Sequence, residues 1–162
     1  MLKRKESFVF YYNQYKDKIF AYFLYRVGFD RKLAEDLTSE AFLKALKNFD
    51  NFDVAKPFQP WIFAISHNHL VNHYKLSKRE VPIEGIEGLA KYAHLQVEEK
   101  YEMERVLNII CSMDEADKEI LLLRFSQELT NSEIAEVLNK EEGAIRTQIS
   151  RSLVKLREKL NR

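Results

Sequence analysis

The stretch TNSEIAEVLNKEEGAIRTQISRSLVKLREKL (130–160) decides how the C-terminal part of this chain folds. Thr130 and Glu133 form a Ser/Thr-x-x-Glu capping box, which predicts the start of a short helix. Asn139 follows as a residue that tolerates the left-handed backbone of a tight turn. Beyond the turn, apolar residues recur at helical spacing and predict a longer amphipathic helix. The stretch therefore predicts a helix-turn-helix.

The longer helix of this pair carries polar and basic side chains of the types that bind DNA bases and phosphates. At 100° per residue, its polar and basic residues lie opposite the apolar stripe or on its flanks. They are Arg146, Thr147, Gln148, Ser150, Arg151 and Lys155. Arginine bonds guanine bidentately, glutamine pairs with adenine, and lysine or serine holds phosphates. A solvated polar face is the alternative interpretation, but the capped helix in front favours DNA binding.

Helical periodicity also predicts three helices nearer the N-terminus, over residues 6–27, 31–48 and 60–78. Gly28 is expected to end the first of them as its C′ residue. Asp30 is expected to cap the second. This part of the chain therefore folds as a group of consecutive helices.

Two segments divide the chain, because each contains Pro or Gly or breaks the helical periodicity. Residues 49–59 read as an aromatic-bearing loop, and REVPIEGIEGLAKYAHLQV (79–97) reads as a linker between domains. We therefore predict an all-α fold with two small helical domains, 1–80 and 98–162, joined by the linker 81–97. Two further helices are expected ahead of the helix-turn-helix, over residues 98–112 and 114–125.

Composition agrees with helices and restricts the compartment. The 162 residues include 4 Gly and 3 Pro, too few turn residues for many short strands. The single Cys111 excludes an intramolecular disulfide and a cysteine-rich zinc finger, and it is expected to be buried and inert. No apolar run approaches the roughly 20 residues of a membrane span, and the opening MLKRKESF lacks the apolar core of a secretory signal. We expect a cytoplasmic protein.

The formal net charge of +1 conceals a strong asymmetry along the chain. Residues 1–80 carry a net charge of +5, residues 101–139 carry −6, and residues 140–162 carry +4. A polyanion is attracted by local basic patches rather than by the average charge. The asymmetry is therefore a weak indication of nucleic acid binding.

The third predicted helix and the loop before it carry a second set of groups suited to nucleic acid. Aromatic rings stack on unpaired bases, while amides and cations hold bases and phosphates. The candidates are Phe52, Phe58, Asn68, Asn72, Lys75 and Arg79, whereas Trp61, Phe63 and Ile65 are assigned to the core. His69 and His73 have the i, i+4 spacing of a metal site, but no glutamate follows His69, so the HExxH pattern is missing. We expect no metal and no cofactor.

The second predicted helix presents an acidic and apolar patch. Asp36 and Glu40 lie one turn apart beside Leu43, which favours a site for a protein partner. The alternative is a solvated face with an ion pair between Glu40 and Lys44. Paired carboxylates also serve in acid–base catalysis, but the sequence has no recognisable nucleophile or glycine-rich phosphate loop. We therefore expect no enzyme and no small-molecule substrate.

Four segments in order resemble the bacterial extracytoplasmic-function (ECF) sigma factors, a branch of the sigma-70 family. They are AEDLTSEAFLKAL (34–46), PWIFAISHN (60–68), DKEILLLRF (117–125) and SEIAEVLNKEEGAIRTQISRSLVKLREKL (132–160). The helix-turn-helix alone also resembles LuxR-type regulators. The resemblance implies a sigma factor that binds core RNA polymerase, directs promoter-specific initiation and is held inactive by an anti-sigma factor.

The resemblance also implies roles for particular residues. The helix 31–48 would dock on the β′ clamp helices, and the second domain would meet the β flap. The implied polymerase contacts are Asp36, Leu37, Ser39, Glu40 and Leu43, with Ser39 standing where the family usually has Gln. The loop before the third helix would capture a flipped base of the minus-ten element, which Asn68 and Asn72 would also contact. Gln148 replaces a basic residue in the helix that would read the minus-thirty-five element.

Two other classes of function remain open on the sequence. A stand-alone helix-turn-helix regulator of LuxR type would bind promoters without polymerase. A helical interaction module that does not read DNA would tolerate replacement of Arg146 and Arg151. Contact with a membrane is expected only indirectly, through an anti-sigma factor.

Overall fold

The computed structural model describes residues 2–77 and 97–162, and every regular element in these ranges is helical. The all-α prediction is confirmed. The linker residues 81–96 and the candidate Arg79 lie outside the described residues. The elements are α1 (Leu2–Arg26), α2 (Arg31–Asn48), η1 (Phe49–Asn51), α3 (Phe58–Ser77), α4 (Val97–Cys111), α5 (Glu115–Leu121), η3 (Leu122–Ser126), α6 (Asn131–Leu138) and α7 (Glu142–Leu160).

A tight turn joins α1 to α2 as the sequence predicts. Gly28 has φ 63°, and the Phe29 N–H donates to Leu24 O at 2.9 Å, which closes a Schellman-type end on α1. Asp30 then caps α2, because its carboxylate accepts from the Leu33 N–H at 3.1 Å. Both local predictions are confirmed, and the turn brings α2 back along α1.

An aromatic core holds α1, α2 and α3 together. Phe52 and Phe58 are 4% and 3% exposed, and Phe58 stacks on Tyr11 of α1 with ring centroids 4.3 Å apart. Phe52 also packs against Trp61 at 4.9 Å. The expectation that these two rings offer a surface for stacked bases is therefore wrong for this arrangement. The physical reason is that removing an aromatic side chain from water stabilises the fold, and α1 supplies Tyr11 as the ring on which Phe58 packs.

The C-terminal helices form a second unit built around the predicted helix-turn-helix. The Thr130 hydroxyl accepts from the Glu133 N–H at 3.2 Å, and the Glu133 carboxylate accepts from the Thr130 N–H at 3.1 Å. Asn139 has φ 52° in the turn between α6 and α7. The capping box and the left-handed turn are confirmed. The helix predicted over 114–125 ends at Leu121 and continues as the π-helical turn η3.

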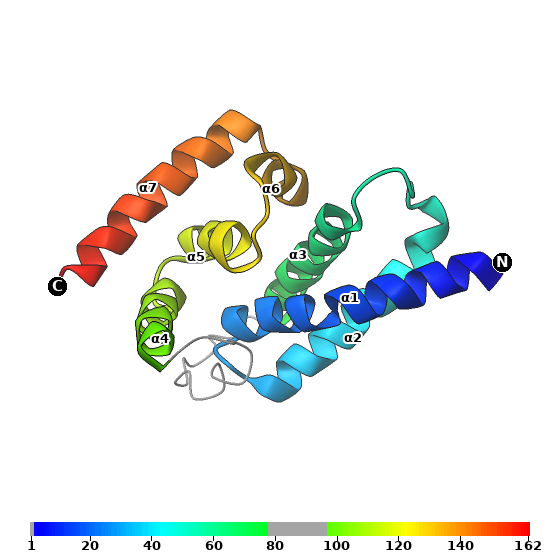
Figure 1. Ribbon diagram of the computed structural model, residues 1–162, viewed down its shortest axis with the longest axis horizontal. Helices are drawn as coiled ribbons and strands as arrows, with labels where there is room; N and C mark the ends of the chain where they lie inside the picture. Colours follow the sequence, from blue (N-terminus) through cyan, green and yellow to red (C-terminus); the bar gives the residue numbers. More distant parts are fainter. Residues whose placement is uncertain (1, 78–96) are drawn as a thin grey trace.

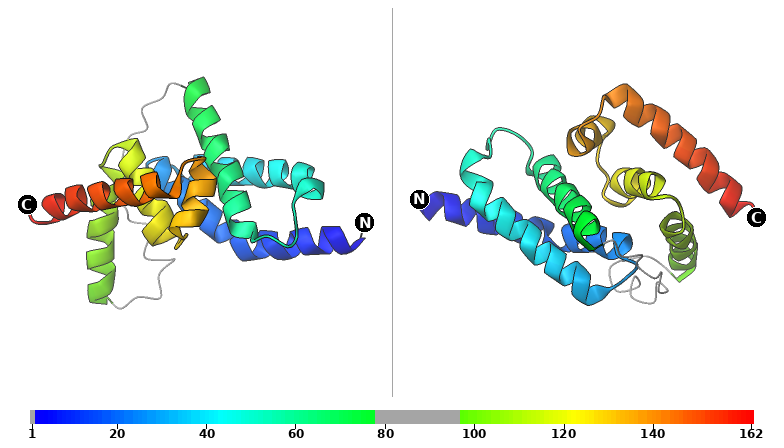
Figure 2. Two further views of the ribbon diagram at one scale, coloured as in Figure 1. Left: turned by 90° about the horizontal axis from the view of Figure 1, so that it is seen from above. Right: turned by 180° about the vertical axis from the view of Figure 1, so that it is seen from behind.

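The two units pack directly on each other. Figures 1 and 2 show α6 lying against α3, with the chain termini at opposite ends of the molecule. The Gln59 side chain of α3 donates to Gln127 O at 3.1 Å, and the Cys111 thiol contacts Tyr25 O at 3.7 Å. Cys111 is 3% exposed, which confirms its predicted burial, and burial raises the pKa of its thiol to about 11, which disfavours the reactive thiolate. No helix in the described ranges is long and apolar enough to cross a membrane.

Candidate nucleic-acid interface

Helix α7 presents a polar face to solvent near its N-terminus. Arg146, Thr147, Ser150 and Arg151 are all exposed, while Ile145 and Ile149 are buried against the rest of the unit. The Thr147 hydroxyl donates to Gly143 O at 3.1 Å, one turn earlier in the helix. The N-terminal part of the second helix of a helix-turn-helix is the part that enters the major groove. The exposed residues therefore stand where such a helix contacts base edges.

Two residues predicted for the same face instead contact α5. The Gln148 amide donates to Ala116 O at 3.3 Å, and the Lys155 ammonium pairs with Asp117 Oδ2 at 2.8 Å. The hydroxyl of buried Ser152 donates to Asp117 Oδ1 at 2.5 Å. In this arrangement both Gln148 and Lys155 orient α7 on α5. Sequence reasoning missed Asp117 because its partners lie 35 and 38 residues further along the chain.

Asp117 carries a carboxylate that is ionised and nearly buried, at 6% exposure. Burial acts to raise its pKa, but the hydrogen bonds from Lys155 and Ser152 outweigh that effect and hold the pKa below its ordinary value of 3.8. In its ionised form, the Asp117 carboxylate therefore anchors α7 on α5.

We expect Asp117→Asn to lower the free energy of unfolding at pH 7 by about 1–3 kcal/mol, because Lys155 and Ser152 lose a charged acceptor. A carboxylate with a depressed pKa stabilises the fold above its ordinary pKa and loses that effect as pH falls through the folded value. Chemical denaturation at pH 7 and near pH 3 should therefore show a difference between variant and wild type that shrinks in acid. Asp17→Asn, an exposed aspartate of α1, is the control. A difference that persists in acid would contradict the anchoring role.

The exposed face of α3 carries the second candidate set. Asn68, Asn72 and Lys75 are exposed at spacings of four and three, while Phe63 and Leu70 are fully buried on the opposite side. The three side chains therefore form one polar stripe along the helix. Their positions allow contact with bases and phosphates of a strand lying along α3.

The candidate partner patch lies on α2. Asp36, Ser39, Glu40 and Leu43 are exposed on one face, and Leu43 is 56% exposed although it is apolar. Leu37 is 1% exposed and belongs to the core, so its assignment to a partner contact is wrong for this arrangement. The reason is helical phase, since Leu37 falls on the stripe with Ala34 and Ala41 that packs inside.

A histidine joins α2 to α3 beside this patch. His69 Nε2 lies 2.7 Å from Glu40 Oε2, and His69 Nδ1 lies 2.8 Å from Lys44 Nζ. The alternative of a direct Glu40–Lys44 ion pair is therefore replaced by a bridge through the imidazole. In the sequence, His69 stands out only for its i, i+4 spacing to His73, where no metal was expected, and nothing in the sequence indicated α2 as the partner of His69.

A buried charge cluster lies where the two units meet. Arg26 at the end of α1 pairs with Glu119 of α5, and these residues are 6% and 4% exposed. Arg26 Nη2 also donates to Glu115 Oε2 at 2.9 Å, and the Tyr22 hydroxyl donates to Glu119 Oε1 at 2.8 Å. His67 Nδ1 lies 3.3 Å from the same oxygen. We call these residues the inter-unit cluster.

The charges of the inter-unit cluster are settled by burial and by Arg26. Burial foremost, with Arg26 and Lys140, lowers the pKa of His67 to about 4, so the imidazole is neutral at pH 7. Burial raises the pKa of Tyr22 to about 12 and keeps the phenol protonated as a donor. The strong interaction in the cluster at neutral pH is therefore the Arg26–Glu119 pair.

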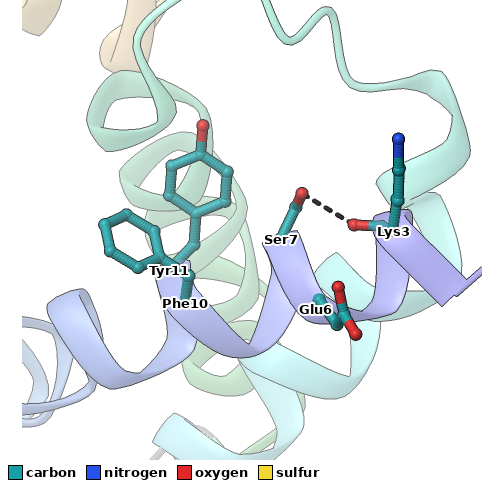
Figure 3. A pocket seen from close by; sticks show the side chains of 5 residues that line it. All are labelled: Lys3, Glu6, Ser7, Phe10 and Tyr11. Atoms are coloured by element: carbon teal, nitrogen blue, oxygen red, sulfur yellow. Dashed lines mark hydrogen bonds between the residues drawn. The ribbon is translucent and has the colours of Figure 1, made fainter.

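A hollow of about 410 Å³ lies along the start of α1. Lys3, Glu6, Ser7, Phe10 and Tyr11 line it, and Figure 3 shows the Ser7 hydroxyl donating to Lys3 O. None of these residues belongs to the polar stripes of α3 and α7 or to the patch on α2.

Comparison with known proteins assigns the two units to two sequence families. Residues 11–80 match sigma-70 region 2, and residues 103–156 match sigma-70 region 4. The ECF RNA polymerase sigma factor BldN of Streptomyces coelicolor is 34% identical over 84% of this chain, which spans 53% of that protein. The ECF RNA polymerase sigma factor SigW of Bacillus subtilis is 28% identical over 90% of this chain and 84% of its own length.

Solved structures share the fold. The sigma factor RpoE in complex with the anti-sigma factor NepR, from Bartonella quintana, superposes with a TM-score of 0.76 at 17% identity and covers 96% of this chain and 98% of its own. CnrH in complex with the cytosolic domain of CnrY gives a TM-score of 0.71 at 20% identity, over 97% of this chain and 89% of its own. At these identities the likeness concerns the fold alone.

Proposed function

This chain belongs to the ECF branch of the sigma-70 family, and on that premise we propose that it binds core RNA polymerase and directs it to specific promoters. One observation carries the proposal: a single chain exposes a basic face on the second helix of a capped helix-turn-helix and a separate amide and lysine stripe on α3. Two DNA-reading faces on separate units suit a promoter with two separate elements.

The roles follow from the chemistry of each face. Arg146 and Arg151 on α7 would read the minus-thirty-five element in the major groove. Asn68, Asn72 and Lys75 on α3 would hold the minus-ten element, and binding unstacked bases there would offset the few kcal/mol that unpairing costs. Asp36, Ser39, Glu40 and Leu43 on α2 would dock on the β′ clamp helices. The polymerase supplies the catalysis, and this chain performs none.

Promoter recognition requires the two units to separate. Elements centred at minus ten and minus thirty-five are about 85 Å apart, at a rise of 3.4 Å per base pair. Here α6 packs on α3, and α7 with its 19 residues is only about 28 Å long. The packed arrangement therefore places the two reading faces too close together, and docking on polymerase would draw the units apart. The described form is a closed state of the free protein.

We place the protein in the cytoplasm with its polymerase and propose an anti-sigma factor as a second partner. The support is the fold shared with RpoE, which was solved in complex with the anti-sigma factor NepR, and with CnrH, which was solved in complex with the cytosolic domain of CnrY. A stand-alone regulator of LuxR type is less consistent with the chain, because residues 11–80 match region 2 and are not needed by a helix-turn-helix acting alone.

The decisive experiment is run-off transcription with purified core RNA polymerase on a library of promoter fragments. Specific transcripts that require this protein would support the proposal and reveal the promoter sequence. Specific duplex binding by the protein alone, without any transcript from the reconstituted enzyme, would replace the proposal with the stand-alone regulator.

The docking face has its own prediction. Asp36→Ala/Glu40→Ala should weaken binding to core polymerase by about tenfold or more, since charged groups desolvated at the centre of an interface dominate its affinity. Fluorescence anisotropy of labelled protein titrated with core polymerase measures this effect. Glu136→Ala, which removes an exposed carboxylate of α6, should bind as wild type does. Equal affinity of the double variant and wild type would remove α2 from the interface.

A further inference from the structure

His69 is held between two charged residues of α2 in a way that fixes its hydrogen-bonding pattern. An ammonium has only donors, so Lys44 donates to Nδ1 at 2.8 Å and the ring proton must sit on Nε2. That proton is donated to Glu40 Oε2 at 2.7 Å. The neutral ring thus relays one hydrogen bond from Lys44 to Glu40.

The surroundings of the ring favour this neutral form. The His69 side chain is 11% exposed and meets the Phe23 ring edge-to-face at 6.4 Å. Burial foremost lowers the pKa of His69, and the nearby Lys44 and His73 act in the same direction while Glu40 opposes them. The imidazole is therefore neutral at pH 7, and its orientation is fixed by packing as well as by hydrogen bonds.

Glu40 gains a fixed position from this bridge. Its side chain remains 57% exposed, so the carboxylate is available to a partner while one oxygen is held from behind. A free glutamate on a helix surface populates several rotamers, and ordering it on binding costs free energy. A carboxylate already held in one rotamer avoids that cost.

We infer that His69 is a positioning residue for polymerase binding: it orients the Glu40 carboxylate of α2 for a basic or hydrogen-bond-donating group on the polymerase. The inference rests on the proposed function and extends it. His69 itself lies on α3, next to Asn68 of the polar stripe that is proposed to hold the minus-ten element. One residue would thereby join the polymerase-docking helix to the promoter-reading helix.

The test compares variants in binding to core polymerase and in thermal unfolding. His69→Phe keeps an aromatic ring against Phe23 but removes both hydrogen bonds, and we expect about tenfold weaker binding, the effect of losing a hydrogen bond to a charged group. In a Glu40→Ala background the same change should have no further effect. His73→Phe, one turn along α3, should bind as wild type does.

A pair of amide variants separates positioning from packing. The amide nitrogen of Gln reaches the place of Nε2, whereas that of Asn reaches only the place of Nδ1 beside Lys44. We expect His69→Gln to retain near wild-type affinity and His69→Asn to lose as much as His69→Phe does. This comparison holds even if the phenylalanine variant proves unstable.

The outcomes distinguish the inference from the function on which it rests. A wild-type protein that does not bind core polymerase would overturn the proposed function. Wild-type binding with unchanged affinity of His69→Phe would overturn the positioning role alone. A loss of equal size in the wild-type and Glu40→Ala backgrounds, or equal affinities of the Gln and Asn variants, would also overturn it, because each points to a purely structural histidine.

Discussion

Replacing both Arg146 and Arg151 with alanine should reduce promoter-specific transcription by about 30-fold or more. Each arginine that bonds a base bidentately contributes about 1–3 kcal/mol of discrimination, and 1.4 kcal/mol corresponds to a factor of ten. Both side chains are exposed on the N-terminal half of α7, so their loss should not disturb the fold. Run-off transcription from the selected promoter, with the variant at saturating concentration over core polymerase, measures the effect.

The matched control is Arg157→Ala, which removes an exposed arginine from the last turn of the same helix, farther from the end that enters the groove. It should transcribe within about twofold of wild type, because one peripheral phosphate contact contributes little to specificity. Both variants should bind core polymerase normally. Undiminished transcription by the double arginine variant would indicate that α7 does not read the promoter.

Replacing Glu119 with glutamine should destabilise the protein by about 3 kcal/mol, the lower end of the cost of removing one partner from a buried ion pair. Arg26 would keep its contacts with the exposed Glu115 and with the Tyr22 hydroxyl, and Tyr22 would lose its charged acceptor. Because Glu119 belongs to α5 and Arg26 to α1, the loss should also weaken the packing of one unit on the other. Chemical denaturation measures the first effect, and small-angle scattering should show a larger radius of gyration.

Two further variants sharpen this test. Glu158→Gln removes an exposed carboxylate of α7 and should leave both measurements unchanged. Arg26→Met/Glu119→Met replaces the pair by apolar side chains and should recover much of the stability, because no charge is left buried without a partner. If Glu119→Gln unfolds at the same denaturant concentration as wild type and has the same radius of gyration, the inter-unit cluster does not hold the units together.

Separation of the units should also affect binding to core polymerase. If the closed state competes with docking on polymerase, then weakening the inter-unit cluster shifts the population toward the open form. The double methionine variant should keep the units packed, and so it tests the cluster without the cost of a buried charge that lacks a partner. Of Glu119→Gln and Arg26→Met/Glu119→Met, the variant with the larger radius of gyration should then bind core polymerase more tightly.

The sequence by itself determined the order of the helices, the ends that carry a capping signal and the helix-turn-helix. Asp30, Gly28 and the Thr130–Glu133 box act within one turn of their own helix, and their roles depend on local backbone geometry alone. Periodicity likewise placed α2 at Arg31–Asn48 without reference to any other element. The family resemblance rested on these same segments and is confirmed by the matches over residues 11–80 and 103–156.

Only the tertiary structure decided which candidate side chains are free. Phe52, Phe58 and Leu37 fall on faces that neighbouring helices cover, and helical phase alone does not say which face that is. Gln148 and Lys155 contact α5, more than 30 residues away along the chain, while the Lys155 side chain stays 52% exposed.

Two side-chain contacts between helices also could not be predicted from the sequence. His69 meets Lys44 across 25 residues, and Tyr22 meets Glu119 across 97. Such contacts depend on how the helices pack, and the free energy of packing is shared among many side chains. Local rules therefore fixed the elements and the kind of site, whereas packing selected the residues that can act in it.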